Sequence, residues 1–538
     1  MIAPDSVTAP AACAPSARAG WLAALTIAAA GMLVALYHAD SRALHHDEAA
    51  SLRKSQYSWD QLVHPRQFED APTLPNQAGP SANTTSELLN RWLFIAGFKV
   101  WTDAFGSSPL AMRGFSIGFH GLFVLAFYAL LLELLRESST RTVPRPRIVA
   151  LIALALGTLN ALALHQAGQV RNYSLCTTLL MLTAWAILRA ARRGRWTDWA
   201  LVAVFGIAAF YSFNVAMMTL AGLWTWFGLR RLFRAPARAE SPVARTSHAP
   251  WIAAAGTTVL ALLPAVLHLA SQRGSHGAAG WWMPVLTWSR FFEFAPGFVF
   301  GDSLFLHNSP ATGVAILAAF ALALYRTWRI GFLLPVVAGL LPFLALVAAS
   351  LTGPNVVIPR YFLVLSPFLY TCMAIALCTI PSHRLQLAAV AGVIAVVLAF
   401  SVRSVTTWDR QSAGGSREIA AWIQRNVEPG ATVIVSPWLY LAVRYYFPPE
   451  ADVRVYVRAD TGIPFYMSGP LLDRRDRVTS LSDLIGDPPK ARHAAYVHVG
   501  INEPPIDPVA LPEGWTVEQR KRFESPFVIS EVVVVRTH

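Results

Sequence analysis

The sequence predicts an α-helical polytopic membrane protein with about 11 transmembrane helices and a C-terminal soluble α/β domain. Three observations predict this fold class. Of the 538 residues, 54% are hydrophobic and only 14% are charged, which is more apolar surface than one soluble core uses. Apolar runs long enough to cross a bilayer recur up to residue 402. The remaining segment changes to short strand patterns.

The first apolar run, residues 20–39, has about 20 residues, which at ~1.5 Å rise per residue matches a hydrocarbon core of ~30 Å. A cleaved signal peptide is disfavoured, because no clear small-x-small cleavage site follows and many further runs come after it. These runs lie at about 114–135, 148–164, 173–191, 251–269, 311–325, 330–351, 361–380 and 385–402.

The uncharged stretch from Trp199 to Leu229 decides the number of spans. At ~1.5 Å per residue it is too long for one untilted span, and Tyr211–Asn214 interrupts it near the middle. Two spans place every arginine-rich loop on one face, as the positive-inside rule requires. We therefore predict two spans here, a cytoplasmic N-terminal tail at 1–19 and a transmembrane domain at 20–402.

The net charge of +13 comes mainly from arginines in short loops between apolar runs, a pattern that sets membrane topology rather than binding nucleic acid. The four cysteines show no disulfide or metal-thiolate spacing. With the N-terminus in the cytoplasm, residues 40–113 and everything after 403 lie on the other side. The Ala- and Arg-rich composition is typical of bacteria, so we expect a multi-pass protein of the cell inner membrane.

The tail, residues 403–538, is predicted to be a periplasmic α/β domain. REIAAWIQRN has the pattern of an amphipathic helix and is followed by a Pro-Gly turn. VIVS, RVYVR, AYVHV and EVVVVR have strand patterns. The tail contains no nucleophile elbow, phosphate-binding glycine loop or zinc spacing, so we expect it to cover or support the membrane part.

Charged residues that are suited to catalysis or phosphate binding follow the first span and stand at the start of two later ones. Asp47 and Glu48 lie just outside the first span, on the same face as Arg171 and Arg360. A carboxylate can act as a general base on an alcohol, and a guanidinium can hold a phosphate through two hydrogen bonds. This combination suits transfer from a lipid phosphate. The alternative is that these charges are solvated and serve only topology.

Five segments in order carry a family resemblance: HHDEAASL (45–52), the amphipathic stretch 92–125, QVRNYSL (169–175), PNVVIPRYFLVLSPFL (354–369) and the start of the tail (408–437). Together they resemble the polytopic C-type glycosyltransferases (GT-C) that use polyprenyl-phosphate sugars. That group includes bacterial relatives of protein mannosyltransferases and the lipid A aminoarabinose transferases. The segments cover most of the chain.

The resemblance implies transfer of a hexosyl or pentosyl group from a polyprenyl-phosphate donor to an acceptor hydroxyl on the periplasmic side, with inversion. It implies Asp47 as the general base, with Glu48 beside it in the catalytic pair. Arg171 and Arg360, together with Tyr173 and Tyr361, would bind and orient the donor phosphate. The acceptor would be a lipid, a glycan or a protein. Membrane lipids are expected partners, and nucleic acid is not.

The sequence also departs from the family pattern. Residues 84–89 replace a His-Pro-Pro turn, so Glu87 is a candidate acceptor or metal contact only. Gln169 and Val170 stand before the span-opening arginine where relatives often have an acid. His46 and His165 are further candidate acceptor or metal contacts, although interfacial histidines are more often bound to backbone or water. The sequence specifies no cofactor and leaves a divalent metal open.

Two other classes compete with the enzyme. A multi-pass transporter or flippase of envelope precursors would place its charges near mid-span, in broken helices arranged as a repeat. Here the acids and arginines lie at span ends on one side. A non-catalytic scaffold would need far fewer spans and would be insensitive to Asp47→Asn. The sugar and the acceptor stay open.

Overall fold

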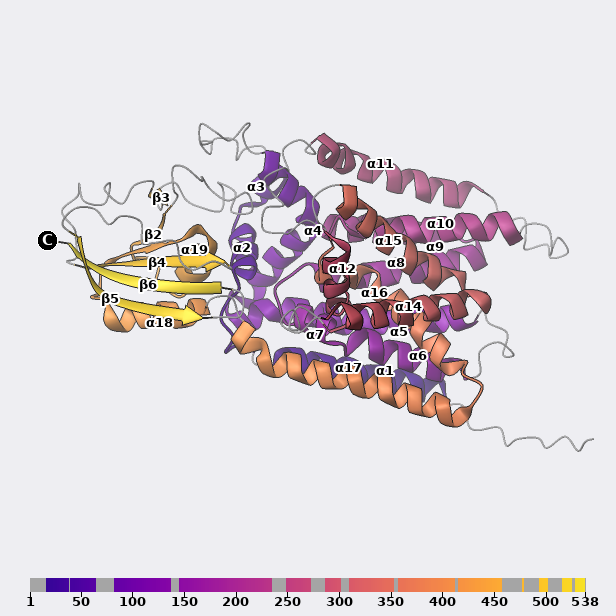
Figure 1. Ribbon diagram of the computed structural model, residues 1–538. Helices are drawn as coiled ribbons and strands as arrows, with labels where there is room; N and C mark the ends of the chain where they lie inside the picture. The colour runs from indigo at the N-terminus through magenta and orange to yellow at the C-terminus, as the bar shows by residue number, and fades with distance from the viewer. Residues whose placement is uncertain are drawn as a thin grey trace, which may run out of the picture.

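The computed structural model shows a bundle of long helices with a smaller sheet domain at one end (Figure 1). It describes residues 16–37, 39–63, 82–136, 145–234, 248–271, 286–300, 309–352, 357–411, 415–456, 477–478, 493–501, 515–524 and 528–537.

The helical part runs through most of the chain. Its elements are α1 (Ala17–Leu36), α2 (His46–Ser55), α3 (Trp59–Val63), α4 (Ala82–Phe105), α5 (Pro109–Arg136), α6 (Pro146–Thr158), α7 (Ala161–Ala167), α8 (Tyr173–Arg193), α9 (Trp196–Ser212), α10 (Ala216–Arg234), α11 (Ala249–Ser271), α12 (Trp288–Phe294), α13 (Gly297–Phe300), α14 (Pro310–Arg329), α15 (Leu333–Thr352), the 3-10 helix η5 (Pro359–Val364), α16 (Ser366–Cys378) and α17 (His383–Gln411).

Within the described ranges, seven helices are long and apolar enough to cross a membrane, or eight if α6 and α7, bent by 60°, form one span. The predicted break in the uncharged stretch is confirmed, since α9 ends at Ser212 and α10 begins at Ala216. Both helices are shorter than their combined run, as the interruption by polar residues requires. The exact number of 11 spans is not confirmed and stays a prediction.

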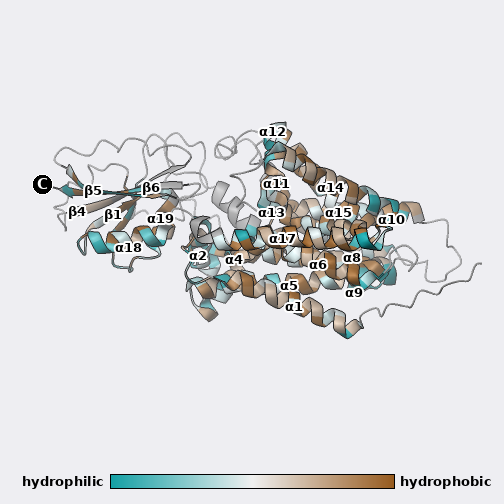
Figure 2. Ribbon diagram, turned by 60° about the horizontal axis from the view of Figure 1, so that its bottom comes forward, coloured by the Kyte–Doolittle hydropathy of each residue, from teal (hydrophilic) through white to brown (hydrophobic). Residues whose placement is uncertain are grey.

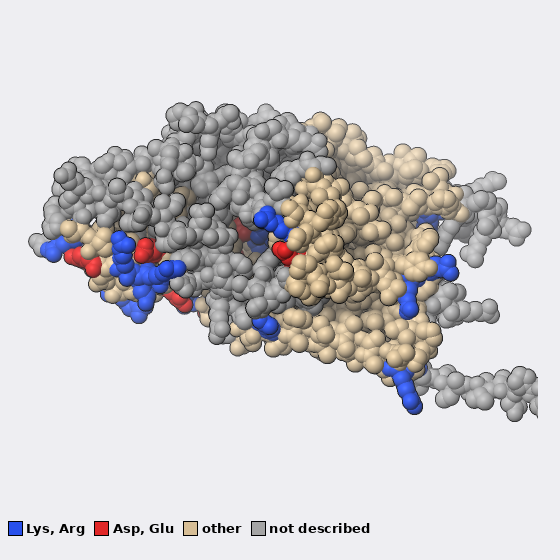
Figure 3. Space-filling model, in the orientation of Figure 1, with Lys and Arg blue, Asp and Glu red and all other residues tan. Residues whose placement is uncertain are grey.

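The bundle is apolar on the inside and on its sides. Helices α5, α8 and α9 pack together at its centre, and their buried side chains join one large hydrophobic cluster. Apolar colouring covers most of the long helices (Figure 2). On the visible face, the charged side chains that are drawn gather at the ends of the bundle and on the sheet domain (Figure 3). This is the distribution that a lipid environment requires.

In the described residues of the C-terminal part, six strands form a mixed sheet that is accompanied by two helices. Its elements are α18 (Ser416–Asn426), β1 (Thr432–Val435), α19 (Pro437–Arg444), β2 (Val453–Tyr456), β3 (Arg477–Val478), β4 (His493–Ile501), β5 (Trp515–Glu524) and β6 (Val528–Thr537). The strand order is β3-β2-β1-β4-β6-β5, with β1 parallel to β2 and β4, and β6 antiparallel to β4 and β5. The four predicted strands and the amphipathic helix are confirmed as β1, β2, β4, β6 and α18.

One hydrophobic cluster crosses from the helical part into the sheet domain. It contains Leu44 and Leu52 around α2, Phe98 of α4, Ile423 of α18 and Val433 of β1 among its buried members. Helix α19 packs against α2. The sheet domain is therefore packed on the segment that follows the first span.

Candidate active site

The site is built around the first turn of α2. His45 is the N-cap residue, and its Nδ1 accepts a hydrogen bond from the backbone N–H of Asp47 (3.2 Å). The Glu48 carboxylate reaches back to the N–H of His45 (2.9 Å), which completes a capping box. The helix start thus fixes Asp47 at N2, where its side chain is about a quarter exposed.

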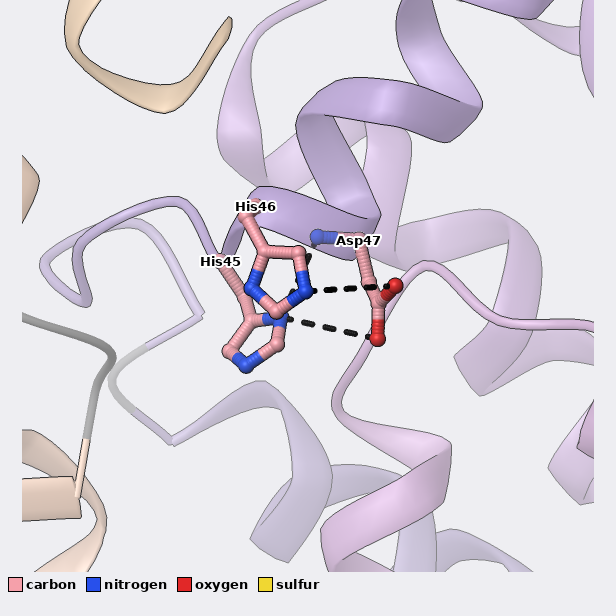
Figure 4. A group of neighbouring side chains, drawn as sticks. All are labelled: His45, His46 and Asp47. Atoms are coloured by element: carbon pink, nitrogen blue, oxygen red, sulfur yellow. Dashed lines mark hydrogen bonds and ion pairs between the residues drawn. The ribbon is translucent and has the colours of Figure 1, made fainter. Parts of the chain in front are cut away.

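The Asp47 carboxylate lies among polar groups of its own turn. The two imidazoles pack against each other with ring centroids 4.2 Å apart, and both face the carboxylate (Figure 4). His45 Nδ1 is 3.8 Å from one carboxylate oxygen and His46 Nε2 is 3.6 Å from the other. These distances are too long for direct hydrogen bonds.

Two arginines from distant segments meet this carboxylate. Arg171 Nη2 lies 2.8 Å from Asp47 Oδ2, and Arg360 Nη1 lies 3.9 Å from the same oxygen. Arg171 precedes α8 and is buried, whereas Arg360 opens η5 and is about a quarter exposed. The structure therefore brings together the acid and both arginines that the sequence singled out.

The titration of the group follows from burial and from these charges. Burial, together with the neighbouring ring of His46, lowers the pKa of His45 to about 3, and burial also lowers the pKa of His46. Both imidazoles are neutral at pH 7. Burial acts to raise the pKa of Asp47, but the guanidinium group of Arg171, followed by the imidazoles of His46 and His45 and by Arg360, outweighs it and holds that pKa well below its usual range. Asp47 is therefore ionised.

Glu48 is used differently from its neighbour. Its side chain is almost fully buried and pairs with Arg113 of α5, with Nε to Oε1 at 3.0 Å and Nη2 to Oε2 at 2.7 Å. Oε1 also accepts the backbone N–H of Val170 (3.0 Å). Burial would raise the pKa of Glu48, yet the charge and hydrogen bonds of Arg113 bring it down to about 2. Glu48 thus joins α2, α5 and the segment before Arg171.

Arg171 is oriented by its own surroundings. Its backbone carbonyl accepts from Ser116 Oγ (3.2 Å), and its guanidinium carbon lies 5.7 Å from the ring centre of Tyr173. Tyr173 contacts Phe213 edge to face, and Phe213 contacts Tyr361 in the same way, each at 5.3 Å. An aromatic row therefore links the two arginine-bearing segments.

Two further candidates from the sequence are His165 and Glu87. His165 of α7 contacts Gln169 at 2.9 Å between Nε2 atoms, in the turn that leads to Arg171. Glu87 falls in α4, but its side chain lies outside the described part of the structure. Sequence reasoning missed Arg113 and Phe213. Arg113 stands just before the predicted apolar run at 114–135, in the first turns of α5, and Phe213 stands at the break between α9 and α10. These positions at span ends were the signals that the sequence offered.

Three side chains of this turn also have the geometry of a metal site. His45, His46 and Asp47 offer ligand atoms that all lie within 4.8 Å of one another, in the neutral and ionised forms that metals need. Two guanidinium groups close to the carboxylate, however, repel a dication and attract an anion. The residues present fit a phosphate better than a divalent metal.

Comparison with known proteins bears on the fold. No protein family model matches the sequence, and no curated protein matches it. Two solved structures are similar over 96% of this chain and 98% of theirs, at 13% identity: ArnT from Cupriavidus metallidurans in the apo state, with a TM-score of 0.53, and the same protein bound to undecaprenyl phosphate, with a TM-score of 0.54. ArnT is an aminoarabinose transferase of the GT-C class. The chain therefore has the fold of the GT-C glycosyltransferases.

Proposed function

We propose that the chain is an integral membrane glycosyltransferase that moves a sugar from a polyprenyl-phosphate donor to an acceptor hydroxyl. The observation that carries this proposal is the Asp47 carboxylate held beside Arg171 and Arg360 at the ends of helices. The GT-C fold supports it, since ArnT with this fold binds undecaprenyl phosphate. The active side would be the periplasmic face of the inner membrane, with residues 20–402 as the transmembrane domain and 403–538 as the periplasmic domain.

Asp47 would act as the general base. It accepts the proton of the acceptor hydroxyl while the hydroxyl oxygen forms a bond to the anomeric carbon of the sugar. The bond from that carbon to the phosphate oxygen breaks, and its electron pair leaves with the polyprenyl phosphate. Attack opposite the leaving group inverts the anomeric centre. A carboxylate oxygen accepts more than one hydrogen bond, so Asp47 can bind a hydroxyl while Arg171 stays near.

The two arginines would stabilise the leaving group. Polyprenyl phosphate gains negative charge as the bond breaks, and fixed guanidinium groups lower the energy of that charge without reorganisation. Arg171 is buried and oriented by Ser116 and Tyr173, so its guanidinium group is suited to donate hydrogen bonds to the phosphate from a fixed position. The side chain of Arg360 is more exposed than that of Arg171. Tyr361 and Tyr173 keep the two segments aligned through Phe213.

Donor binding would also activate the base. While Asp47 is paired with Arg171, its low pKa makes it a weak proton acceptor. A bound phosphate competes for the same guanidinium groups and adds negative charge, and both changes raise the pKa of the carboxylate. The base therefore becomes stronger when the donor is in place.

Glu48 would serve as a positioning residue in this reaction. Both of its oxygens are occupied by Arg113, His45 and Val170, and its side chain is buried. Its contact with Val170 sets the distance between α2 and the segment of Arg171. It therefore aligns the base with the phosphate-binding arginine without touching substrate.

The decisive experiment measures sugar transfer in membranes that contain the full-length chain, with a panel of radiolabelled polyprenyl-phosphate sugars. Wild type is compared with Asp47→Asn and with Asp103→Asn at matched expression. Asp103 lies at the outer end of α4 and is exposed, so it is a matched control for loss of one carboxylate.

We expect label to move from one donor to an acceptor in the wild type and in the Asp103→Asn variant. Asp47→Asn should lose about a hundredfold or more, the scale of a positioned general base. Transfer from no donor at all would refute the enzyme class. Equal transfer by Asp47→Asn and wild type would refute the base assignment and leave the class standing.

A further inference from the structure

Side chains bind every backbone carbonyl of the turn between α1 and α2, from residue 39 to residue 44. On the membrane side, Arg113 Nη1 donates to the carbonyls of Ala39 and Arg42, and its Nη2 donates to the carbonyl of Ala43 (3.1 Å). The same guanidinium holds Glu48. One buried arginine of α5 therefore fixes half of the turn and the helix start that follows it.

The C-terminal domain holds the other half of this turn. Arg417 Nη1 donates to the carbonyls of Asp40 (3.3 Å) and Ser41 (2.9 Å). At Leu44 both backbone groups are taken by this domain: Ser416 Oγ donates to its carbonyl (3.0 Å), and its N–H donates to Tyr446 Oη (2.8 Å).

Of the two contacts at Leu44, the one from Ser416 is buried and the one to Tyr446 is partly buried. Leu44 and Ser416 have no exposed surface, and Leu44 belongs to the hydrophobic cluster that joins α2 to the sheet domain. Backbone groups in such surroundings need their partners, because water does not replace them. Leu44 precedes the N-cap His45, so its position sets where α2 begins and where Asp47 points.

We propose that the C-terminal domain is a positioning part of the active site, in which Tyr446 and Ser416 hold Leu44 and thereby hold Asp47 against Arg171. This inference rests on the proposed function, in which Asp47 is the base. It gives the domain a role in the reaction itself, beyond covering the membrane part. A misplacement of about 1 Å can lower a rate on the order of a hundredfold, so a single lost support is measurable.

The test variant is Tyr446→Phe, which removes the oxygen that accepts from Leu44. Its matched control is Tyr445→Phe. Tyr445 is the adjacent residue and also reaches across the junction, but its hydroxyl donates to the carbonyl of Ser107, which lies between α4 and α5 and is not part of the turn (2.9 Å). Both variants lose one hydroxyl and one contact between domains.

Kinetics separate positioning from general damage. We expect Tyr446→Phe to lower kcat by about tenfold, with a donor KM within about twofold of wild type, because both arginines lie on other elements. Tyr445→Phe should keep the wild-type kcat. Added to Asp47→Asn, Tyr446→Phe should lower kcat by less than about threefold, because its effect passes through Asp47.

Hydrogen exchange of the full-length protein in detergent gives a readout that does not depend on activity. Tyr446→Phe should increase deuterium uptake in peptides that cover residues 39–49, and Tyr445→Phe should not. Ser416→Ala should act like Tyr446→Phe.

The proposal is overturned if Tyr446→Phe matches Tyr445→Phe in both kcat and exchange. It is also overturned if Tyr446→Phe lowers kcat equally with and without Asp47, because the loss would then be general. A wild type that transfers sugar from no donor defeats the proposed function instead. In that case the exchange comparison still decides whether the domain holds the turn.

Discussion

Asp47 of α2 and Arg171, which precedes α8, form an ion pair with 2.8 Å between Oδ2 and Nη2. A second guanidinium group, that of Arg360, places its Nη1 3.9 Å from the same oxygen. Two cationic groups thus share one carboxylate. The local excess of positive charge makes this point of the structure a receptor for an anion.

The pH profile should show base activation by the donor. In the free protein the pKa of Asp47 is well below its usual range, so the acid limb of kcat/KM for the donor should lie below about pH 4. With phosphate bound, the acid limb of kcat should move up by about one pH unit. Steady-state transfer rates from pH 3 to pH 9 measure both limbs. The assignment of Asp47 as the base is contradicted if the acid limbs of kcat/KM and kcat coincide, or if either limb lies near pH 6.5, where a histidine titrates.

Arg171→Ala should weaken donor binding. A hydrogen bond to a charged group contributes about 1.5–3 kcal/mol, which corresponds to roughly tenfold to a hundredfold in affinity. Arg171→Lys should recover only part of this, because an ammonium cannot bind a phosphate through a planar pair of donors. Competition by unlabelled polyprenyl phosphate measures the affinity.

The control for this substitution is Arg425→Ala. Arg425 is exposed on α18, and its Nε donates to the carbonyl of Ala421 in the same helix. Its removal should leave donor affinity unchanged. An Arg171→Ala protein with wild-type affinity would exclude Arg171 as the phosphate ligand.

Glu48→Gln should destabilise the fold at neutral pH. It leaves the buried guanidinium of Arg113 without its counter-charge, at a cost of about 3–5 kcal/mol. The folded pKa of Glu48 is about 2, below the ordinary value of 4.5, so its contribution is complete above about pH 5 and is lost as the pH falls to about 2. Thermal unfolding in detergent should therefore show a Tm gap at pH 7 that narrows in acid. Glu450→Gln, at an exposed turn, should show no gap at either pH.

Gly313→Ala should loosen the packing of α12 on α14. A Cβ at Gly313 would collide with the backbone carbonyl of Phe292, which cannot swing aside as a side chain can. Overpacking of this kind typically costs about 1–3 kcal/mol. Gly256→Ala in α11 is the control, because its Cβ would meet no atom within 4 Å. A lower Tm for both variants, or for neither, would show that the close approach at Gly313 is not what limits stability.

The long helices and most of the tail could be predicted because their signals are local. Apolar length and the polar break near Phe213 separate α9 from α10, and short valine-containing runs mark β1, β2, β4 and β6. The sequence did not predict β5, because WTVEQRKRFE lies at the sheet edge and carries mostly polar side chains. The sharp bend between α6 and α7 was also hidden inside one apolar run.

The site could be predicted in its charged members and not in its supports. Asp47, Arg171 and Arg360 stand out as charges at span ends, and the topology predicted from the sequence places all three on the same face of the membrane. Arg113 stands just before the apolar run at 114–135, where sequence alone does not tell a buried ion pair from a charge at the interface. The sequence predicts Glu48 as a member of the catalytic pair, and its ion pair with Arg113 is a tertiary contact between α2 and α5 that the sequence does not display.

The ribosome adds Leu44 long before Tyr446, so the hydrogen bond between them forms only after both residues have been synthesised. On the proposals above, a nascent chain that already carries Asp47 and Arg171 still lacks the last support of its catalytic turn. Copies cut short by premature termination or by proteolysis before α18 would sit in the membrane without spending lipid-linked sugar. On these proposals, activity begins only after the chain has been made through Tyr446 and that part of the C-terminal domain has folded onto Leu44.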